Sequence, residues 1–306
     1  MWFAIALLGY FFLAIVFVLD KLILTKTLDK PVVYTFYSTI FMFGALLAWP
    51  LGVQWLAAPD WLWAFVSGIA FGLGLWSMFI AVKREEASHI NPFIGAITII
   101  ATYVLASVFL AERLSPASVW GAVVLFAATL LLSLFGEGRR SGISRGLWWG
   151  VAAGMFFAIS HISSKYLYEI YPFVTAFVWT RATTGLVGAA CLFFPAVRQT
   201  FRRGESKTVR HCRSCGFSRR YAIALVTSAK LLGVVAVICI QYAIALGSVT
   251  LVNALVGLQY ALMFLLIYLS TRYLPKIFKE HFSRKELIVE TAAIVLVLLG
   301  SALFVL

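Results

Sequence analysis

Apolar residues run along the chain in about ten unbroken stretches, which short polar segments separate. A bilayer core of about 30 Å requires about 20 apolar residues per helix. The stretches are continuous rather than alternating, so the pattern favours helices over the strands of a barrel. We therefore predict an all-α integral membrane protein of ten transmembrane helices. The expected spans are residues 2–20, 32–50, 61–82, 90–111, 116–135, 146–167, 173–194, 221–244, 249–271 and 287–306.

The second half of the chain repeats the layout of the first half. Pro31 opens the second span and Pro172 opens the seventh, and Val, Phe, Thr and Gly follow each proline at the same offsets. Five spans per half is an odd number, so the second half enters the membrane from the opposite side. We expect two inverted five-helix repeats, residues 1–140 and residues 141–306.

Composition and charge placement support a membrane protein and give its orientation. Hydrophobic residues make up 62% of the chain and charged residues 12%, whereas a soluble domain carries about 25% charged residues. The loops that follow the odd-numbered spans hold 21 of the 25 Lys and Arg residues. The positive-inside rule therefore puts the loop 195–220 in the cytoplasm and both termini outside a plasma membrane. The basic loops face membrane lipids, and we expect no binding of nucleic acid.

Two motifs resemble a known transporter family. The segment 109–115 (FLAERLS) closes the fourth span, and 247–253 (GSVTLVN) opens the ninth. With the five-plus-five layout, they are similar to the EamA-like transporter family of the drug/metabolite transporter superfamily. The resemblance implies a secondary carrier that moves small metabolites by alternating access through a central cavity. The family often has prolines where Ala101 and Tyr260 stand here, and it usually keeps both termini in the cytoplasm. We follow the charges on orientation, because the bias is spread over five loops.

Two cations near the middle of spans are the main candidates for substrate binding. Arg181 and Lys230 lie about 12–13 Å from the ends of their spans, at about 1.5 Å per helical residue, and no Asp or Glu occupies the middle of any span. Such groups normally face a cavity or a partner. We expect a small-molecule substrate with an anionic group, which the two-pronged guanidinium suits. The alternative is that each cation binds backbone carbonyls at a helix end or kink.

The acidic residues closest to the spans have two interpretations. Asp20 and Glu290 are candidates for a proton-coupling carboxylate, and the alternative is an interfacial ion pair with a neighbouring Lys or Arg. An exposed ion pair at a span end contributes little energy. Other charged residues at the mouths of the bundle are expected to be structural, with Glu112 and Arg113 as one pair: Lys21, Lys165, Glu112 and Arg113.

Polar and aromatic residues inside spans form a second group of substrate-binding candidates. His161 lies in an unusually polar turn of the sixth span with Ser160, Ser163 and Ser164. Their alternative role is hydrogen bonding between packed helices. Glycines in the third and sixth spans, among them Gly68 and Gly154, predict close helix packing. The remaining candidates are Asn253, Gln259 and Tyr260 in the ninth span, and Tyr37 and Trp179 as rings that stack on a substrate.

The sequence gives little indication of other chemistry. Cys212 and Cys215 have no second CxxC partner, so we expect no metal site. We find no P-loop pattern, and expect no ATP or other cofactor. We therefore predict a transporter rather than an enzyme. The alternatives are a flippase for a lipid-linked sugar or phosphate, a membrane-embedded enzyme, and a scaffold that transports nothing.

Overall fold

The structure is a computed structural model that describes residues 1–24, 30–84, 87–134, 145–202, 219–273 and 284–303. Most of these residues form helices, and none of the described residues belongs to a strand. The helices are α1 (Trp2–Leu24), α2 (Pro31–Ile40), the 3₁₀ helix η1 (Phe41–Leu51), α3 (Asp60–Arg84), α4 (Ala87–Phe109), α5 (Pro116–Leu134), α6 (Arg145–Ile170), α7 (Phe173–Cys191), α8 (Pro195–Arg202), α10 (Arg219–Leu246), α11 (Val249–Ala254), α12 (Val256–Tyr273) and α13 (Arg284–Ala302).

The all-α membrane architecture expected from the apolar pattern is confirmed. Each expected span falls on a described helix, except that the second is divided between α2 and η1 and the ninth between α11 and α12. The ninth span breaks at Leu255, whereas α4 continues through Ala101. Six stretches of the described chain are long and apolar enough to cross a membrane: Trp2–Leu19, Pro31–Leu51, Asp60–Arg84, Ile90–Phe109, Arg145–Ile170 and Val249–Leu266. The count of ten spans stays a prediction.

Prolines and short polar side chains determine where several helices begin. Pro31 is the first residue of α2, and Pro116 is the first residue of α5. A proline is favoured there because its fixed φ suits a helix and its missing N–H would have no intrahelical partner. Ser115 precedes Pro116, and its hydroxyl accepts a hydrogen bond from the amide of Ser118 at 3.1 Å. This cap explains the serine at the end of the 109–115 motif.

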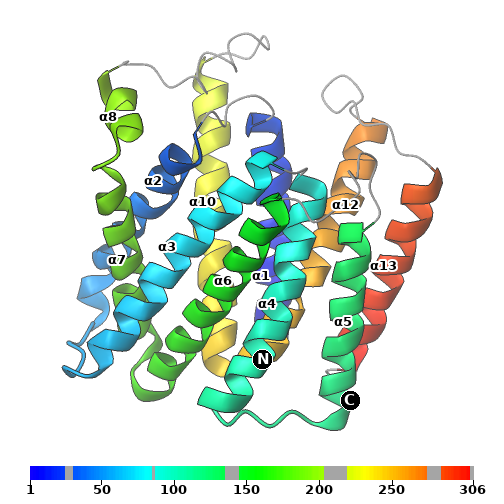
Figure 1. Ribbon diagram of the computed structural model, residues 1–306, viewed down its shortest axis with the longest axis horizontal. Coiled ribbons are helices and arrows are strands. Elements are labelled where there is room, and N and C mark those ends of the chain that lie inside the picture. The colour runs from blue at the N-terminus through cyan, green and yellow to red at the C-terminus, as the bar shows by residue number, and fades with distance from the viewer. Residues whose placement is uncertain (25–29, 85–86, 135–144, 203–218, 274–283, 304–306) are drawn as a thin grey trace.

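The helices stand side by side in one bundle, and both chain termini lie at the same end (Figure 1). We call this end the terminal face. Helix α8 lies at the other end, which we call the opposite face (Figure 1). The loop 195–220 therefore begins on the opposite face, and residues 203–218 of that loop lie outside the described part of the chain.

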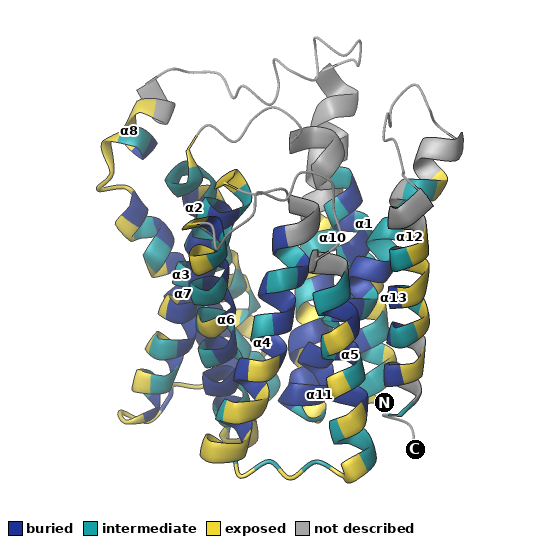
Figure 2. Ribbon diagram, turned by 45° about the vertical axis from the view of Figure 1, so that its right-hand side comes forward, coloured by how far each residue is buried: buried dark blue, intermediate teal, exposed yellow. Residues whose placement is uncertain are grey.

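The two halves of the chain contact each other throughout the bundle. Helix α3 packs most extensively on α6 and also on α7, while α1 packs most extensively on α10 and also on α12. Helix α4 packs on α6, and α5 packs on α13. Figure 2 shows α11 as a buried segment, and exposed residues occur on the outward sides of α5 and α13. The interior of the bundle is thus an interface between the first and second halves.

Close helix packing at glycine is visible in the α3–α7 contact. A Cβ atom on Gly68 would lie only 2.5 Å from the backbone nitrogen of Thr184. A Cβ atom on Gly154 would likewise lie 2.7 Å from the side chain of Ile97 on α4. These glycines let the helix backbones approach more closely than any larger residue permits.

Candidate functional site

Helix α7 places Arg181 in the middle of the bundle. The helix begins after Pro172 and runs for 19 residues, and Arg181 is its ninth residue. The Arg181 side chain is only 2% exposed. The hydroxyl groups of Thr180 and Thr184 donate to carbonyl oxygens four residues earlier, at 2.8 and 2.9 Å. The hydroxyl protons of these threonines are thus used within the helix, and Arg181 is the one charged side chain of α7.

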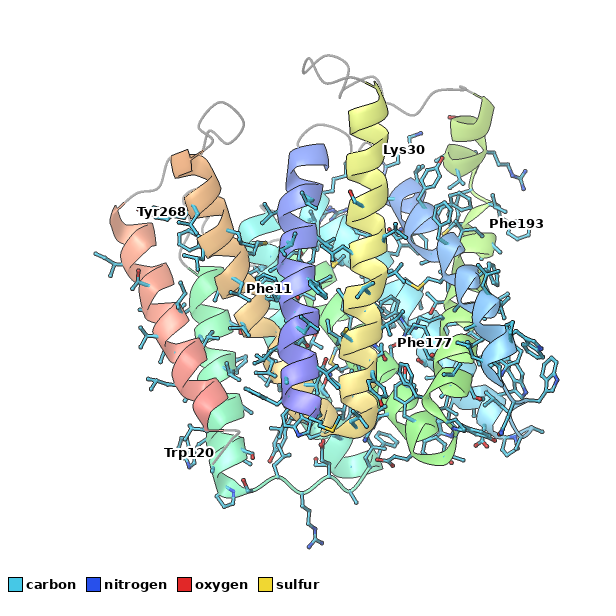
Figure 3. The ribbon with its side chains drawn as sticks, turned by 180° about the vertical axis from the view of Figure 1, so that it is seen from behind. Phe11, Lys30, Trp120, Phe177, Phe193 and Tyr268 are labelled. Carbon is cyan, nitrogen blue, oxygen red and sulfur yellow. The ribbon has the colours of Figure 1, made fainter. Side chains whose placement is uncertain are left out.

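Aromatic rings surround the guanidinium of Arg181. Its Cζ atom lies 4.5 Å from the ring centroid of Phe71 on α3 and 5.8 Å from that of Phe177 on α7. Figure 3 shows Phe177 about midway between the two ends of the bundle. Among the described residues, none hydrogen-bonds to Nε, Nη1 or Nη2 of Arg181. The rings attract the face of the cation, and its N–H edge lacks an acceptor.

The acidic side chains that the structure describes are engaged elsewhere. A carboxylate oxygen of Asp60 accepts a hydrogen bond from the Tyr171 hydroxyl at 2.7 Å. Glu112 accepts one from the Thr250 hydroxyl at 2.7 Å. Glu169 pairs with Lys165 at 3.5 Å. None of these three described carboxylates neutralises Arg181.

His161 lies near Arg181, and the side chain of Asn253 lies next to His161. His161 on α6 interacts electrostatically with Arg181 and meets the side chain of Asn253 on α11. The Nδ1 atom of His161 and the Nδ2 atom of Asn253 are buried, and neither has a hydrogen-bond partner among the described residues. Three sequence candidates from three helices thus meet in one cluster, which we call the central site (Arg181, His161 and Asn253).

Several polar residues around the central site were not predicted from the sequence. Tyr168 interacts electrostatically with Arg181 and donates a hydrogen bond to Gln241 at 2.9 Å. Tyr10 donates to the backbone oxygen of Val252 at 2.9 Å. A polar residue in an apolar span was the available signal for Gln241, whereas tyrosines are too common in this chain to stand out.

The ninth span places its other two candidates differently. The Tyr260 hydroxyl donates to the backbone oxygen of Asn91 at 2.8 Å, so this tyrosine joins α12 to α4. Gln259 is buried. The Oδ1 atom of Asn91 and the Oγ1 atom of Thr102 are buried without a partner among the described residues. Helix α4 therefore adds two unpaired polar groups that the sequence did not single out.

The serines near His161 join two helices. The Ser67 hydroxyl on α3 lies 3.1 Å from the backbone oxygen of Ser160 and 2.6 Å from the Ser164 hydroxyl. Ser163 donates to the carbonyl of Ile159 in its own helix. The structure thus gives these serines the interhelical and backbone bonds that were the alternative to lining a cavity.

The two aromatic candidates lie away from the central site. Tyr37 is 40% exposed and its ring packs on Phe36. Trp179 stacks on Trp55 with 4.9 Å between ring centroids and lies 4.7 Å from Trp61. Its indole N–H donates to the backbone oxygen of Gln54 at 2.8 Å. Trp179 therefore anchors the segment 52–59 to the beginning of α7.

Tyr171 makes a second attachment of the segment 52–59. Its hydroxyl accepts a hydrogen bond from the amide of Ala57 at 2.9 Å and donates to Asp60. The Ala57 amide lowers the pKa of Tyr171, whereas the hydrogen bond to Asp60 and the charge of that carboxylate raise it. The balance leaves the pKa of Tyr171 above its ordinary value, so the phenol is protonated at neutral pH.

The charged residues expected at the mouths have specific partners where they are described. Glu112 bonds to Thr250 rather than to Arg113, which is exposed. Lys165 pairs with Glu169 and donates to the backbone oxygen of Ala245 at 3.3 Å. Four other candidates lie on helices, but their side chains are outside the described residues: Asp20, Lys21, Lys230 and Glu290.

The described residues offer no clustered metal ligands. Within the ranges that the structure covers, no three His, Cys, Asp or Glu side chains come together in a metal-binding arrangement. Cys191 and Cys239 are free thiols. Cys212 and Cys215 fall within 203–218, outside the described residues.

Comparison with known proteins identifies the first half of the chain. Residues 1–134 match the model of the EamA-like transporter family. A solved structure described only as the crystal structure of a protein matches 98% of this chain and 97% of its own, with a TM-score of 0.64 and 19% identity. That identity supports a shared fold alone. No curated protein matches the chain. Residues 1–134 are thus similar to the EamA-like transporter family of the drug/metabolite transporter superfamily, and this match, together with the apolar helices, indicates a multi-pass membrane transporter.

Proposed function

We propose that the protein is a secondary carrier that moves a small anionic metabolite across the plasma membrane by alternating access. The observation that carries this proposal is Arg181, whose guanidinium is buried and has no hydrogen-bond acceptor among the described residues. The anionic group of the solute would bind the free N–H edge of that guanidinium. His161 and Asn253 would complete the contacts in the central site.

The energetics favour an anion as the missing partner. A charged group deep in a membrane span costs about 2.5–3.5 kcal/mol or more. A desolvated cation–π contact returns about 2 kcal/mol, which the Phe71 ring at 4.5 Å can supply. The five N–H donors of a guanidinium still require acceptors. A carboxylate or phosphate accepts two of them in parallel, which is a strong and directional interaction.

The packing of the helices supports inverted repeats of residues 1–140 and 141–306. If α1 corresponds to α6, α3 to α10 and α4 to α11–α12, the α3–α6 contact has the α10–α1 contact as its counterpart. The α4–α6 contact corresponds in the same way to α12–α1, and α5 pairs with its own counterpart α13. Such exchange of partners is expected for two repeats related by a pseudo-twofold axis in the membrane plane.

The charge bias supports an orientation with the opposite face in the cytoplasm. Helix α8 lies on that face, and Arg198 is exposed there. Alkaline phosphatase fused after Leu306 should be active outside the cell, and a fusion within 203–218 should be inactive. An active fusion at 203–218 with an inactive one after Leu306 would reverse the orientation.

The substrate can be sought by ligand-induced stabilisation of the purified protein. A panel of amino acids, sugar phosphates and nucleotide sugars would be screened by thermal shift, because a bound ligand raises stability as RT ln(1 + [L]/Kd). We expect the stabilising compounds to be anions. A panel in which only neutral or cationic compounds stabilise the protein would contradict the proposed substrate class.

Uptake of the stabilising compound into proteoliposomes then tests Arg181. Removing one partner of a buried charged hydrogen bond costs about 2–5 kcal/mol, so R181M should reduce uptake by about 30-fold or more. R181K keeps the charge but loses the paired donors, and we expect an intermediate rate. R198M is the matched control on the exposed surface. Wild-type uptake by R181M would overturn the proposed role of Arg181.

A further inference from the structure

An unusual turn at the end of α4 places Glu112 over the second half of the chain. The amides of Leu110 and Glu112 both donate to the carbonyl of Ala106, at 3.0 and 3.2 Å. Ala111 between them has φ = 48°, a left-handed conformation that residues other than glycine rarely adopt. Helices commonly end with one residue in this left-handed conformation, and that residue is usually glycine. Here the turn directs the Glu112 carboxylate towards α11.

Glu112 holds the first turn of α11. Its Oε2 atom accepts a hydrogen bond from the fully buried Thr250 hydroxyl at 2.7 Å. Hydrogen bonds to an ionised acceptor are shorter and stronger than neutral ones. Asn253 of the central site follows Thr250 by three residues, and positions three apart share one face of a helix. The position of Asn253 therefore depends on the contact between Glu112 and Thr250.

Helix α11 is a short segment that is separate from α12. It spans six residues and is separated from α12 at Leu255. Besides Glu112, Tyr10 holds it through the hydrogen bond to the oxygen of Val252. Both of these anchors come from the first half of the chain, whereas Arg181 and His161 lie on α6 and α7 of the second half. Movement of one half relative to the other would thus separate Asn253 from His161.

We propose that Glu112 is a positioning residue for Asn253 and that its bond to Thr250 closes the central site towards the terminal face. With the bond intact, α11 holds the Asn253 side chain beside His161, which in turn lies near Arg181. With the bond broken, α11 withdraws and the central site opens to the terminal face. Such gating elements complete a site in the closed state and release it in the open state. The inference rests on the proposed transport function, because it assigns Asn253 and Arg181 to one solute.

The exposure of a cysteine on α11 measures this opening without a known substrate. In a variant whose four cysteines are replaced, Ala254 on α11 is changed to Cys, and the rate of modification by N-ethylmaleimide is followed in the purified protein. Ala254 is fully buried, so the rate reports the open population when opening is rapid. Ala153, equally buried on α6, is changed to Cys in a matched control protein. E112Q, T250V and T250S are then introduced into both backgrounds.

The proposal predicts a local and selective change. T250V removes the bond and should raise the labelling rate at A254C about tenfold. E112Q keeps a neutral acceptor for the Thr250 hydroxyl and should raise the rate by a smaller factor. The double variant should be labelled no faster than T250V. T250S keeps the hydroxyl, so A254C should be labelled as slowly as without a substitution at Thr250. If Thr250 only filled space, T250S would instead be labelled as fast as T250V. The A153C rate should stay constant. An unchanged A254C rate, an equal rise at both positions, or failure of T250S to restore slow labelling would overturn the proposal.

The outcome separates the gate from the anion site. Faster A254C labelling together with normal uptake by R181M would leave the gate standing and reject the role of Arg181. Unchanged labelling together with lost uptake in R181M would reject the gate and leave the anion carrier standing.

Discussion

Replacing Gly68 by alanine should destabilise the protein by pushing α3 away from α7. The added Cβ would meet the Thr183 hydroxyl and lie 2.5 Å from the Thr184 backbone nitrogen. Ordinary contact begins at 3.4 Å, so the two helices must separate by about 0.9 Å. The hydrogen bond from Thr183 Oγ1 to the oxygen of Ala64 would then lengthen from 2.8 Å to about 3.7 Å, beyond hydrogen-bonding range.

The size of this effect follows from three contributions. Overpacking of a close contact costs about 1–3 kcal/mol, and loss of the Thr183 bond costs about 1 kcal/mol. Alanine in place of glycine within a helix offsets about 1 kcal/mol. We therefore expect G68A to lower the free energy of unfolding by about 1–3 kcal/mol.

Gly233 on α10 provides the matched control. A Cβ atom there would make only ordinary contacts, the closest at 3.8 Å to Val16. G233A should thus gain about 0.5–1 kcal/mol from helix propensity. Thermal unfolding of the purified variants in detergent measures both changes. If G68A unfolds at the wild-type temperature, or at a higher temperature than G233A, then α3 and α7 do not pack as closely as described.

Three other predictions concern contacts between the halves. S67A removes the bonds from α3 to Ser160 and Ser164 and should lower the free energy of unfolding by about 1 kcal/mol. The control S107A removes only a local bond of an exposed serine and should leave stability unchanged, so equal melting temperatures of the two variants would refute this prediction. W179F loses the bond to Gln54, so proteolysis within 52–59 should be faster than in the wild type. W120F changes an exposed tryptophan and serves as the control. An unchanged rate of cleavage in W179F would contradict the role of Trp179 in holding this segment. Y171F should be less stable than the wild type at pH 6–9, because the raised pKa of Tyr171 keeps the phenol protonated and bonded to Asp60 in that range. The difference in stability should shrink only above about pH 10, where the phenol ionises. A difference that disappears near pH 7 would refute the Asp60–Tyr171 bond.

The positions of the helices could be predicted from the sequence because every span needs about 20 apolar residues to cross the bilayer. Apolar length alone predicted segments that fall on the described helices, and prolines such as Pro31 and Pro116 indicated where helices begin. The break at Leu255 had no such signal, since no proline stands there. The division of the second span into α2 and η1 was likewise absent from the apolar pattern.

The centre of the site was predictable only in part. Arg181 stands out because an ionisable residue in an apolar span is rare, and His161 and Asn253 stand out for a similar reason. Phe71 could not be identified, because the chain has 26 phenylalanines and only the fold selects the one beside a guanidinium. The contact of Trp179 with Trp55 could not be predicted either, because it joins residues far apart in the sequence.

The hydroxyl groups of α7 have a consequence for selectivity. Thr180, Thr183 and Thr184 donate to backbone carbonyls, and Thr175 accepts from the amide of Gln54. The single hydroxyl protons of Thr180, Thr183 and Thr184 are thus already used, and these three side chains can only accept a hydrogen bond from a solute. In the proposed carrier, Arg181 would then be the side chain of α7 that donates to an anionic group, and the threonines could contact only donors such as the solute's own hydroxyls.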